Sequence, residues 1–458
     1  MKEAKFLPQV LHLTEQDIDT AEQRAHYTVG LIGCRQKAIF AALAFSEAGF
    51  KVKCTDADQS VTRRLSKGIV RLENREAELK LKSFVRAEQI TASSDLKAVV
   101  AASDIIVLTI DTKIDEKKAA DYSESKNICK QIGAALSKGG IFIYMGVGGF
   151  GFTEDVVREN LENTSGLKAG EDFGLAYCRL DDAIGHQETQ ANPVEIVVAA
   201  DDKYSLSAAA LILETLAKQG VKRTLGTRTA ELATLFDAVK RDSDIAMTNE
   251  LAIFCETAGI DYSDVLKLMR NYSSKDTVLP TISEEANRNE AYMLLENAEN
   301  LNAKLRLPAL ARQVNEDIIR HAVNLTQDAM RSGGKPLRRA RVALLGASLE
   351  PETAHAAFFA MLEAKGAKVT RYSSYGTEDA QSEEGCPIKK TLNEAVEGTD
   401  CVVVLSETEQ LKRLNLKKLH ALMKLPAAFV DLTGQFEPAK VEEAGFTYRG
   451  FGRGVWKK

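Results

Sequence analysis

Residues 27–56 read YTVGLIGCRQKAIFAALAFSEAGFKVKCTD, and their pattern indicates the fold class. The apolar run 27–32 predicts a strand, residues 38–48 predict a helix that a glycine ends, and residues 50–55 predict a second strand. Gly33 begins the turn between the first strand and the helix. A strand, a helix and a strand within about 30 residues are typical of a parallel βαβ unit.

Two further strands are predicted at 104–110 and 140–144, and helical segments separate them. Both are short apolar runs without alternation, as expected when a sheet is covered on both faces. The first part of the chain, up to about residue 195, is therefore predicted to form an open, doubly wound sheet.

The rest of the chain divides into a helical part and a second α/β part. Residues 203–330 have helical periodicity, and 228–258 predict one long helix of the kind that bridges domains or forms a dimer contact. A second βαβ unit begins at 341, with further strands at 401–405 and 427–431. The predicted fold class is α/β: two Rossmann-like, doubly wound parallel-sheet domains joined by a long-helix central domain.

The expected boundaries place an N-terminal tail or docking arm at 1–25 and a Rossmann-like domain at 26–200. A helical central and dimerisation domain follows at 201–332, and a second Rossmann-like domain at 333–458.

Composition excludes several classes of function. The formal charge of −5 argues against a nucleic-acid binder, which would normally carry a basic excess. No apolar run reaches the 18 or so residues that a membrane span needs. Seven cysteines without a CxxC pair favour a reducing cytoplasm over a disulfide framework or a zinc ribbon. The six histidines show no metal-ligand spacing, so no metal is expected.

Three strings carry a family resemblance: SGLKAGEDFGLAY at 165–177, the RD…NELA…CE…GID pattern at 241–261, and EAGFTY…GFGRG at 443–454. The order of parts and these strings resemble the nucleotide-sugar 6-dehydrogenases, the superfamily of UDP-glucose and UDP-N-acetylmannosamine dehydrogenases. The resemblance covers about 25–454. It implies a degenerate dinucleotide-binding domain at 26–200 and a UDP-sugar-type domain at 333–458.

The resemblance also implies a mechanism. In the family, NAD+ twice removes hydride from C6 of a UDP-sugar, while a cysteine holds the sugar as a thiohemiacetal and then a thioester. A lysine and an asparagine on the long helix hold the oxyanion and a water. An aspartate follows the cysteine, and a threonine and a glutamate after two of the strands assist the water chemistry.

Almost every one of these positions is changed in this chain. The lysine position is Thr234 and the asparagine position is Ala238, neither of which supplies a cation or an amide donor. Ala286 stands at the cysteine position and Glu290 at the aspartate position. Val147 stands at the threonine position and Leu180 at the glutamate position. No cysteine lies within 279–295. Cys386 stands in a string, EGCPIK, that superficially resembles the missing motif, but it belongs to the acidic stretch 373–390.

The cofactor loop departs from the dinucleotide fingerprint as well. GxGxxG has become Gly33-Cys34-Arg35-Gln36-Lys37-Ala38, and Arg35 puts a long side chain where pyrophosphate should lie. Asp56 still suits a ribose hydroxyl pair. Arg35 and Lys37 could hold a phosphate or mononucleotide, or they could be solvated surface charges. From these residues we expect no cofactor, with NAD possible but disfavoured, and Gly33, Arg35 and Asp56 as the candidate nucleotide contacts.

The sequence therefore predicts a catalytically inactive relative of a UDP-sugar 6-dehydrogenase that serves as a regulatory, scaffolding or sugar-nucleotide-binding partner. It would pair with itself or with an active relative through the central helix. The alternatives are an active enzyme in which the fold hosts another chemistry, and an NAD-dependent nucleotide-sugar dehydrogenase with divergent active-site residues.

Overall fold

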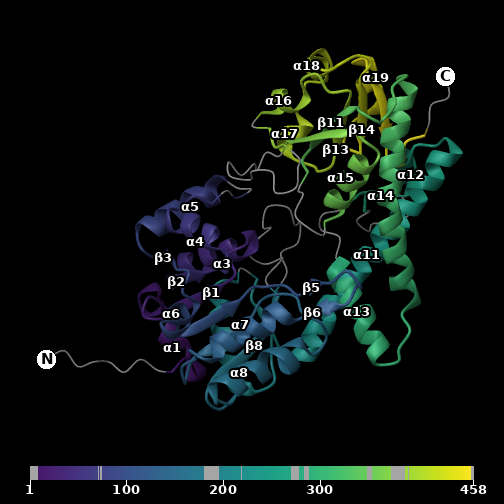
Figure 1. Cartoon of the computed structure of the whole chain (residues 1–458). Helices are drawn as coiled ribbons and strands as arrows, with labels where there is room; N and C mark the ends of the chain where they lie inside the picture. The colour runs from purple at the N-terminus through teal and green to yellow at the C-terminus, as the bar shows by residue number, and fades with distance from the viewer. Residues whose placement is uncertain are drawn as a thin grey trace. The chain divides into compact units, whose positions relative to one another are not determined.

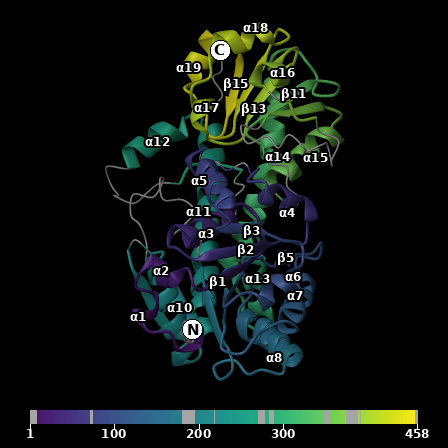
Figure 2. The same ribbon diagram turned by 90° about the vertical axis from the view of Figure 1, so that its left-hand side faces the viewer.

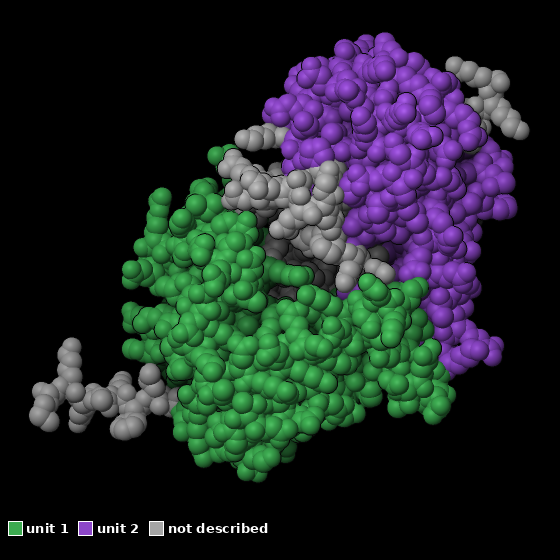
Figure 3. Space-filling model, in the orientation of Figure 1, with its two compact units in different colours: residues 1–238, 292–303 green, residues 239–291, 304–458 purple. Residues whose placement is uncertain are grey.

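The computed structural model describes residues 9–70, 72, 75–179, 195–217, 219–269, 278–282, 288–347, 353–372, 387–389 and 391–454. These residues form two compact units, which Figure 3 shows in green and purple. Unit 1 comprises residues 1–238 and 292–303, and unit 2 comprises 239–291 and 304–458. The long helix α11 (Thr227–Ala258) crosses from one to the other. The three-domain division expected from the sequence stays a prediction.

Unit 1 is built on an eight-stranded sheet in the order β10-β9-β8-β7-β4-β1-β2-β3. Neighbouring strands are parallel except β8 and β9, which are antiparallel. The strands are β1 (Thr28–Ile32), β2 (Lys51–Thr55), β3 (Ile90–Ala92), β4 (Ile105–Leu108), β7 (Ile141–Tyr144), β8 (Gly174–Cys178), β9 (Ile196–Ala200) and β10 (Val221–Leu225). A small hairpin, β5 (Lys113–Ile114) and β6 (Ala120–Asp121), follows β4.

Helices cover both faces of this sheet, which explains why its central strands β4 and β7 are apolar without alternation. Ile105 and Val107 of β4 pack with α3 and α10, whereas Ile106 and Leu108 pack on the other face with α7 and α8. Figure 2 shows α3 beside β1 and β2. The helices are α3 (Gln36–Glu47), α4 (Gln59–Ser66), α5 (Arg75–Arg86), α6 (Leu96–Ala101), α7 (Ser123–Gly133), η2 (Thr153–Arg158), α8 (Glu159–Ser165) and α10 (Lys203–Glu214).

The N-terminal segment packs against unit 1. Its short helices are η1 (Val10–His12), α1 (Glu15–Ile18) and α2 (Ala21–Arg24). Val10, Leu13 and Ile18 are buried in the same core as α3. The part of the expected tail or docking arm that the structure describes is therefore folded onto the domain that follows it.

Unit 2 contains a five-stranded parallel sheet in the order β12-β11-β13-β14-β15. The strands are β11 (Arg341–Leu345), β12 (Lys368–Tyr372), β13 (Cys401–Val404), β14 (Ala428–Asp431) and β15 (Thr447–Gly450). Figure 1 shows this sheet with its helices in yellow and light green. Val342 and Leu344 face α14 and α15, and Ala343 and Leu345 face α16, α18 and α19. The two parallel sheets and the long helices confirm the predicted fold class.

The remaining helices belong to the central region and to unit 2. They are α12 (Tyr262–Met269), α13 (Arg288–Asn300), α14 (Arg306–Ser332), α15 (Ala354–Ala364), α16 (Leu392–Val396), α17 (Glu409–Lys412), α18 (Leu416–Leu422) and α19 (Pro438–Glu443). Within the described ranges, every helix is too short or too polar to cross a lipid bilayer.

Candidate functional site

The turn between β1 and α3 begins with a glycine in a left-handed conformation. Gly33 has a φ of +91°, and a Cβ there would lie 2.8 Å from Oγ1 of Thr109. Glycine is therefore required at this position both by backbone conformation and by space. Arg35 precedes the first turn of α3 with an ordinary extended backbone, φ −69° and ψ 168°. Its side chain is exposed and makes no capping hydrogen bond to the helix.

The uncapped start of α3 is the part of this loop that suits an anion. The first backbone N–H groups of a helix have no partner within the helix, and the helix dipole places partial positive charge there. A phosphate commonly satisfies both features. Arg35 adds a cationic side chain beside these donors. The turn therefore presents a site for a phosphate group at the carboxyl edge of the sheet.

Asp56 follows β2 and holds the same turn from the other side. Its Oδ2 accepts the Cys34 N–H at 2.7 Å, and its Oδ1 accepts the Asp58 N–H at 2.9 Å. Each carboxylate oxygen can accept a further hydrogen bond, so Asp56 remains suited to ribose hydroxyls. The structure thus brings the three predicted nucleotide contacts, Gly33, Arg35 and Asp56, into one loop system.

A further position predicted from the sequence lies at the carboxyl edge of this sheet. Val147, the threonine position, follows β7 and is buried. Its N–H donates to Oδ1 of Asp111 at 2.7 Å, and its carbonyl accepts the Thr112 N–H at 2.9 Å. Its isopropyl side chain has no hydroxyl with which to orient a water.

Thr234, the lysine position, uses its hydroxyl within the protein. Oγ1 donates to the Ala230 carbonyl at 3.1 Å and accepts the Tyr177 hydroxyl at 3.0 Å. Tyr177 is buried at the end of β8, and burial raises its pKa. One turn further along α11, Ala238, the asparagine position, is fully buried. With the single Thr234 proton committed to Ala230, this helix face offers no side-chain donor to an oxyanion from either position.

Glu231 lies on α11 and was not predicted as a site residue from the sequence. Its carboxyl group has a raised pKa. Glu231 is 1 % exposed, yet its two oxygens accept the N–H groups of Thr153 at 2.7 Å and Gly151 at 2.8 Å. Burial raises the pKa of Glu231 to about 7, although these hydrogen bonds lower it. Glu231 thereby holds the glycine-rich loop after β7 against α11.

A sequence signal for Glu231 did exist. Residues 227, 231, 234 and 238 recur at helical spacing and share one face of the helix. Except for Glu231 they are small residues, so an acidic side chain on this face is unusual. An acidic residue on an otherwise small, core-facing stripe predicts a buried carboxylate with backbone partners.

Two predicted positions, Leu180 and Ala286, lie outside the described residues. Glu290, the aspartate position, is half-buried on α13, within unit 2. The sequence nevertheless establishes that no cysteine is available between 279 and 295.

The other cysteines are poor nucleophiles in this structure. Six are described, and all are buried: Cys34, Cys54, Cys129, Cys178, Cys255 and Cys401. Burial raises the pKa of the Cys129 thiol to about 12 and also raises the pKa values of Cys178, Cys255 and Cys401. A protonated, buried thiol does not attack a substrate, since the thiolate is the nucleophile. Cys386 lies outside the described residues.

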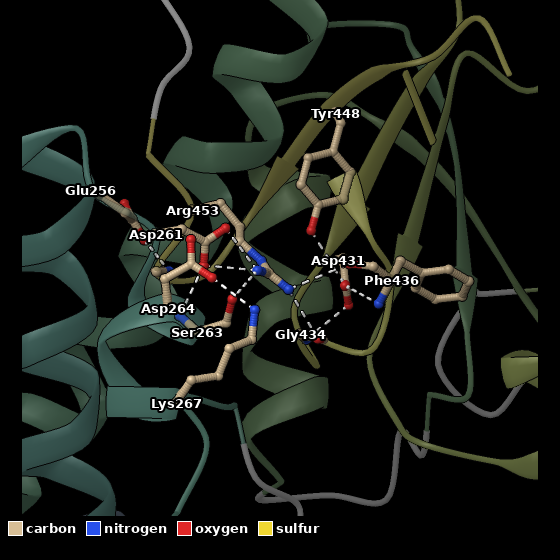
Figure 4. Close-up of polar contacts among 11 residues, drawn as sticks. Glu256, Asp261, Ser263, Asp264, Lys267, Asp431, Gly434, Phe436, Tyr448 and Arg453 are labelled. Carbon is tan, nitrogen blue, oxygen red and sulfur yellow. Dashed lines mark hydrogen bonds and ion pairs between the residues drawn. The ribbon is translucent and has the colours of Figure 1, made fainter. Parts of the chain in front are cut away.

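In unit 2, the segment GFGRG at 450–454 is connected to neighbouring segments through hydrogen bonds of Arg453 (Figure 4). The Arg453 guanidinium donates to both carboxylate oxygens of Asp261 at 2.8 Å and to the Gly434 carbonyl at 3.1 Å. Burial raises the pKa of Asp261, but the hydrogen bonds from Ser263 and Arg453 outweigh it and the pKa is lowered. Arg453 is therefore occupied by protein partners.

The loop after β14 closes around Asp431. This buried carboxylate accepts the N–H groups of Thr433, Gly434 and Phe436 at 2.9–3.0 Å, as well as the Thr433 hydroxyl at 2.7 Å. Over the described residues, no group of three or more His, Cys, Asp or Glu side chains could hold a metal ion.

Solved structures define the class of protein to which this fold belongs. The chain is similar to a UDP-D-ManNAc dehydrogenase from Pyrococcus horikoshii, with a TM-score of 0.78, 20% identity, and 93% of this chain and 99% of that chain covered. It is also similar to the UDP-N-acetyl-mannosamine dehydrogenase Cap5O from Staphylococcus aureus, with a TM-score of 0.74, 20% identity, and 93% and 98% coverage. The fold is that of a nucleotide-sugar dehydrogenase.

Three family models then identify the family, and the chain belongs to the UDP-glucose/GDP-mannose dehydrogenase family. Its NAD binding domain matches residues 28–217, its central domain matches 228–317, and its UDP binding domain matches 352–438. Among relatives, a UDP-N-acetyl-D-mannosamine dehydrogenase of P. horikoshii is 23% identical, with 93% of this chain and 99% of the relative covered. A UDP-glucose 6-dehydrogenase of Rhizobium meliloti is 24% identical, with the same coverage.

The expectation that the chain has no cofactor is wrong, because the matched domain at 28–217 is the NAD binding domain of the family. The structure gives the physical reason. Arg35 adopts an extended conformation open to any residue, so a second glycine is not required there. The Arg35 side chain is exposed and leaves the start of α3 uncapped, and its positive charge favours a pyrophosphate.

Proposed function

We propose that this chain binds NAD and a UDP-sugar but does not oxidise the sugar through the family's cysteine chemistry. In this proposal it is a non-catalytic member of its family that acts as a regulatory or scaffolding partner. The observation that carries the proposal is the state of Thr234. The residue at the lysine position is a hydroxyl already engaged by Tyr177 and Ala230.

The missing nucleophile supports the same conclusion. A thioester requires a thiolate beside the sugar C6, and the interval expected to supply it contains none. The six described thiols are buried. Removing the nucleophile from an enzyme of covalent mechanism typically lowers kcat by about 10⁶-fold.

The geometry of the turn between β1 and α3 supports the proposal that the chain binds NAD. The backbone N–H groups at the start of α3 and the Arg35 side chain suit the pyrophosphate, and Asp56 suits the ribose hydroxyls. When bound, NAD supplies a hydride acceptor. The chain's own residues would position it at the carboxyl edge of the unit 1 sheet, where Val147, Thr234 and Ala238 offer no group that takes up the sugar's proton.

Exposed apolar side chains on α11 support the pairing expected from the sequence. Met247, Leu251 and Phe254 recur at spacings of four and three residues and are 65%, 44% and 68% exposed. Apolar residues at this spacing form one face of a helix. A face of this kind on a helix normally packs against another protein surface. We propose that a second copy of the chain, or an active relative, covers it.

The experiment that tests the binding half of the proposal is calorimetric titration of the full chain with NAD+, then with UDP-glucose and UDP-N-acetylhexosamines. We expect saturable NAD+ binding that Arg35→Glu weakens by about tenfold or more, since a charge-assisted contact to the pyrophosphate is lost. Arg63→Glu, an exposed change on α4, is the matched control. Absence of NAD+ binding to the folded wild-type protein would contradict the proposal.

A second candidate function is an active dehydrogenase with divergent active-site residues. Family models matching all three domains favour it, because the whole enzyme architecture is retained. Under this alternative, NADH forms with a UDP-sugar, and a thiol outside the described residues serves as the nucleophile. Cys386→Ser would then abolish turnover and leave NAD+ binding unchanged.

A further inference from the structure

A cavity of about 550 Å³ lies within unit 2, where α14 ends and β11 begins. Its walls are the last turns of α14, the connection to β11 and Lys365, which follows α15. The connection, with its neighbours, reads RSGGKPLRRAR over 331–341, which is five basic residues and no acidic one. In a chain of net charge −5, this is a local concentration of positive charge.

Four cationic side chains line the cavity: Arg331, Lys335, Arg338 and Lys365. The Nζ of Lys335 pairs with Oδ1 of Asp400 at 2.8 Å. The Nζ of Lys365 donates to a neutral partner, Oε1 of Gln327, at 3.2 Å. Over the part of the chain that the structure describes, Arg331 and Arg338 pair with no carboxylate, and no acidic residue lines the cavity. One of the four cations is thus neutralised by an ion pair.

Helix dipoles account for part of this charge. α14 and α15 both end at the cavity, and basic residues commonly occur where helices end. Each helix end carries about half a negative charge. Two helix ends and one carboxylate together offset about two of the four positive charges, so an excess of about two remains. This excess is what a bound anion would neutralise.

The cavity wall is held in a defined conformation. The Arg339 N–H donates to the Gly366 carbonyl at 2.7 Å, which ties the connection to the turn between α15 and β12. A Cβ built on Gly366 would lie 3.1 Å from Cγ of Arg338, so the Arg338 stem rests on this glycine. This contact restrains the base of the Arg338 side chain, while the residue stays exposed to solvent.

The cavity lies on the opposite edge of the sheet from the usual ligand site. Rossmann-type sheets bind nucleotides at the carboxyl ends of their strands. This cavity precedes β11 and β12 and therefore lies at their amino ends. It also falls mostly outside 352–438, which the UDP binding domain matches. It is thus separate from the sugar-nucleotide site that the family implies.

We propose that this cavity binds a small ligand that carries two or more phosphate groups, of the class of nucleoside polyphosphates. Two free guanidinium groups match the paired oxygens of neighbouring phosphates. The volume suits a nucleotide, since small-molecule sites typically span about 300–1,000 Å³. The inference does not depend on whether the chain oxidises a sugar.

The test is calorimetric titration of the full chain with inorganic tripolyphosphate and with ATP, in millimolar NAD+ and UDP to occupy the other phosphate sites. The variant is Arg331→Glu with Arg338→Glu. The control is Lys304→Glu with Arg306→Glu, which makes the same change of charge on exposed residues of unit 2. Thermal melts establish that both variants fold. We expect saturable binding that the cavity variant weakens by at least about tenfold and that the control leaves within about twofold.

Equal binding of tripolyphosphate and ATP would support recognition of phosphate groups alone, and tighter binding of ATP would add a base contact. The proposal is overturned if neither ligand binds, if both variants lose affinity equally, or if the cavity variant binds as wild type. Binding of an acidic polymer such as polyglutamate, with no binding of either small ligand, would also overturn it in favour of a macromolecular partner.

Discussion

The hydroxyl pair of Thr234 and Tyr177 is the smallest feature on which the functional proposal depends. The sequence identified Thr234 as a changed position from the family resemblance. It could not show that the hydroxyl is occupied, because Tyr177 is far away in the chain and reaches it only through the packing of β8 against α11. The sequence shows which residue replaces a motif residue, but it does not show which other residue the new side chain contacts.

We predict that Thr234→Val lowers the free energy of unfolding by about 1–3 kcal/mol, because the buried Tyr177 hydroxyl loses its acceptor. In a double-mutant cycle with Tyr177→Phe, the two changes should couple by about 0.5–1.5 kcal/mol. Denaturant unfolding of the four proteins measures this coupling. Strictly additive effects would mean that the pair does not form.

Glu231 gives a pH-dependent prediction. Its pKa is about 7 in the folded protein, above an ordinary value of 4.5, so the folded state binds the proton more tightly than the unfolded chain. The stabilisation from the protonated carboxyl is complete below about pH 4.5 and is lost as pH rises to about 7. Glu231→Gln removes this dependence, so the stability of wild type relative to the variant should fall as the pH rises from about 4.5 to about 7.

Urea unfolding at a series of pH values measures that difference. Glu159→Gln, an exposed change on α8, is the control and should show no such trend. A stability difference for Glu231→Gln that does not vary with pH would show that this carboxyl titrates normally.

At the scale of elements, four strands of the unit 1 sheet were predicted from the sequence, whereas the buried apolar strands β8 and β9 and the polar edge strand β10 were not. β1, β4 and β7 were anticipated from largely apolar runs, and β2, which reads KVKCT, was anticipated as the second strand of the βαβ unit. β10 was missed because it reads VKRTL and is largely exposed at the sheet edge. The helix predicted at 228–258 is observed at Thr227–Ala258. Edge strands take their conformation from a neighbour rather than from burial of their own side chains.

The exposed face of α11 gives a prediction at the same scale. Met247→Asp with Phe254→Asp should convert a dimer to monomers, because two charges would enter an apolar contact. Light scattering measures the mass. Leu79→Asp, on α5 and 59% exposed, is the matched control and should leave the mass unchanged. If the wild-type protein is monomeric at micromolar concentration, the proposal of a homodimer is excluded and only pairing with a relative remains.

At the scale of the whole molecule, the chain has the fold of its family, and we propose that residues of the family's usual chemistry have changed. Packing constrains many positions weakly and tolerates substitution, whereas a thioester mechanism needs one sulfur at one place. The sequence therefore indicated the family and the changed positions together. The expectation of no cofactor, which the match to the NAD binding domain overturned, weighed only the side chains of the motif, whereas the N–H groups that suit an anion at the start of α3 belong to the backbone.

We predict that NAD+ raises the thermal stability of the protein. At a concentration of 100 times Kd, a ligand that binds only the folded state adds about 2.7 kcal/mol to the free energy of unfolding. Scanning calorimetry with and without NAD+ measures the shift, which Arg35→Glu should reduce at the same NAD+ concentration. An unchanged melting temperature at saturating NAD+ would show that the start of α3 does not hold the dinucleotide.

The most direct measurement is a single-turnover assay with the protein in excess over a limiting amount of each UDP-hexose or UDP-N-acetylhexosamine, with more than two NAD+ for each sugar, followed at the absorbance of NADH. We predict that NAD+ is bound and that no NADH forms over hours. Two NADH for each sugar would demonstrate complete oxidation to the acid and contradict it. One NADH for each sugar, with an aldehyde product, would contradict it too, by showing that hydride transfer survives without the cysteine.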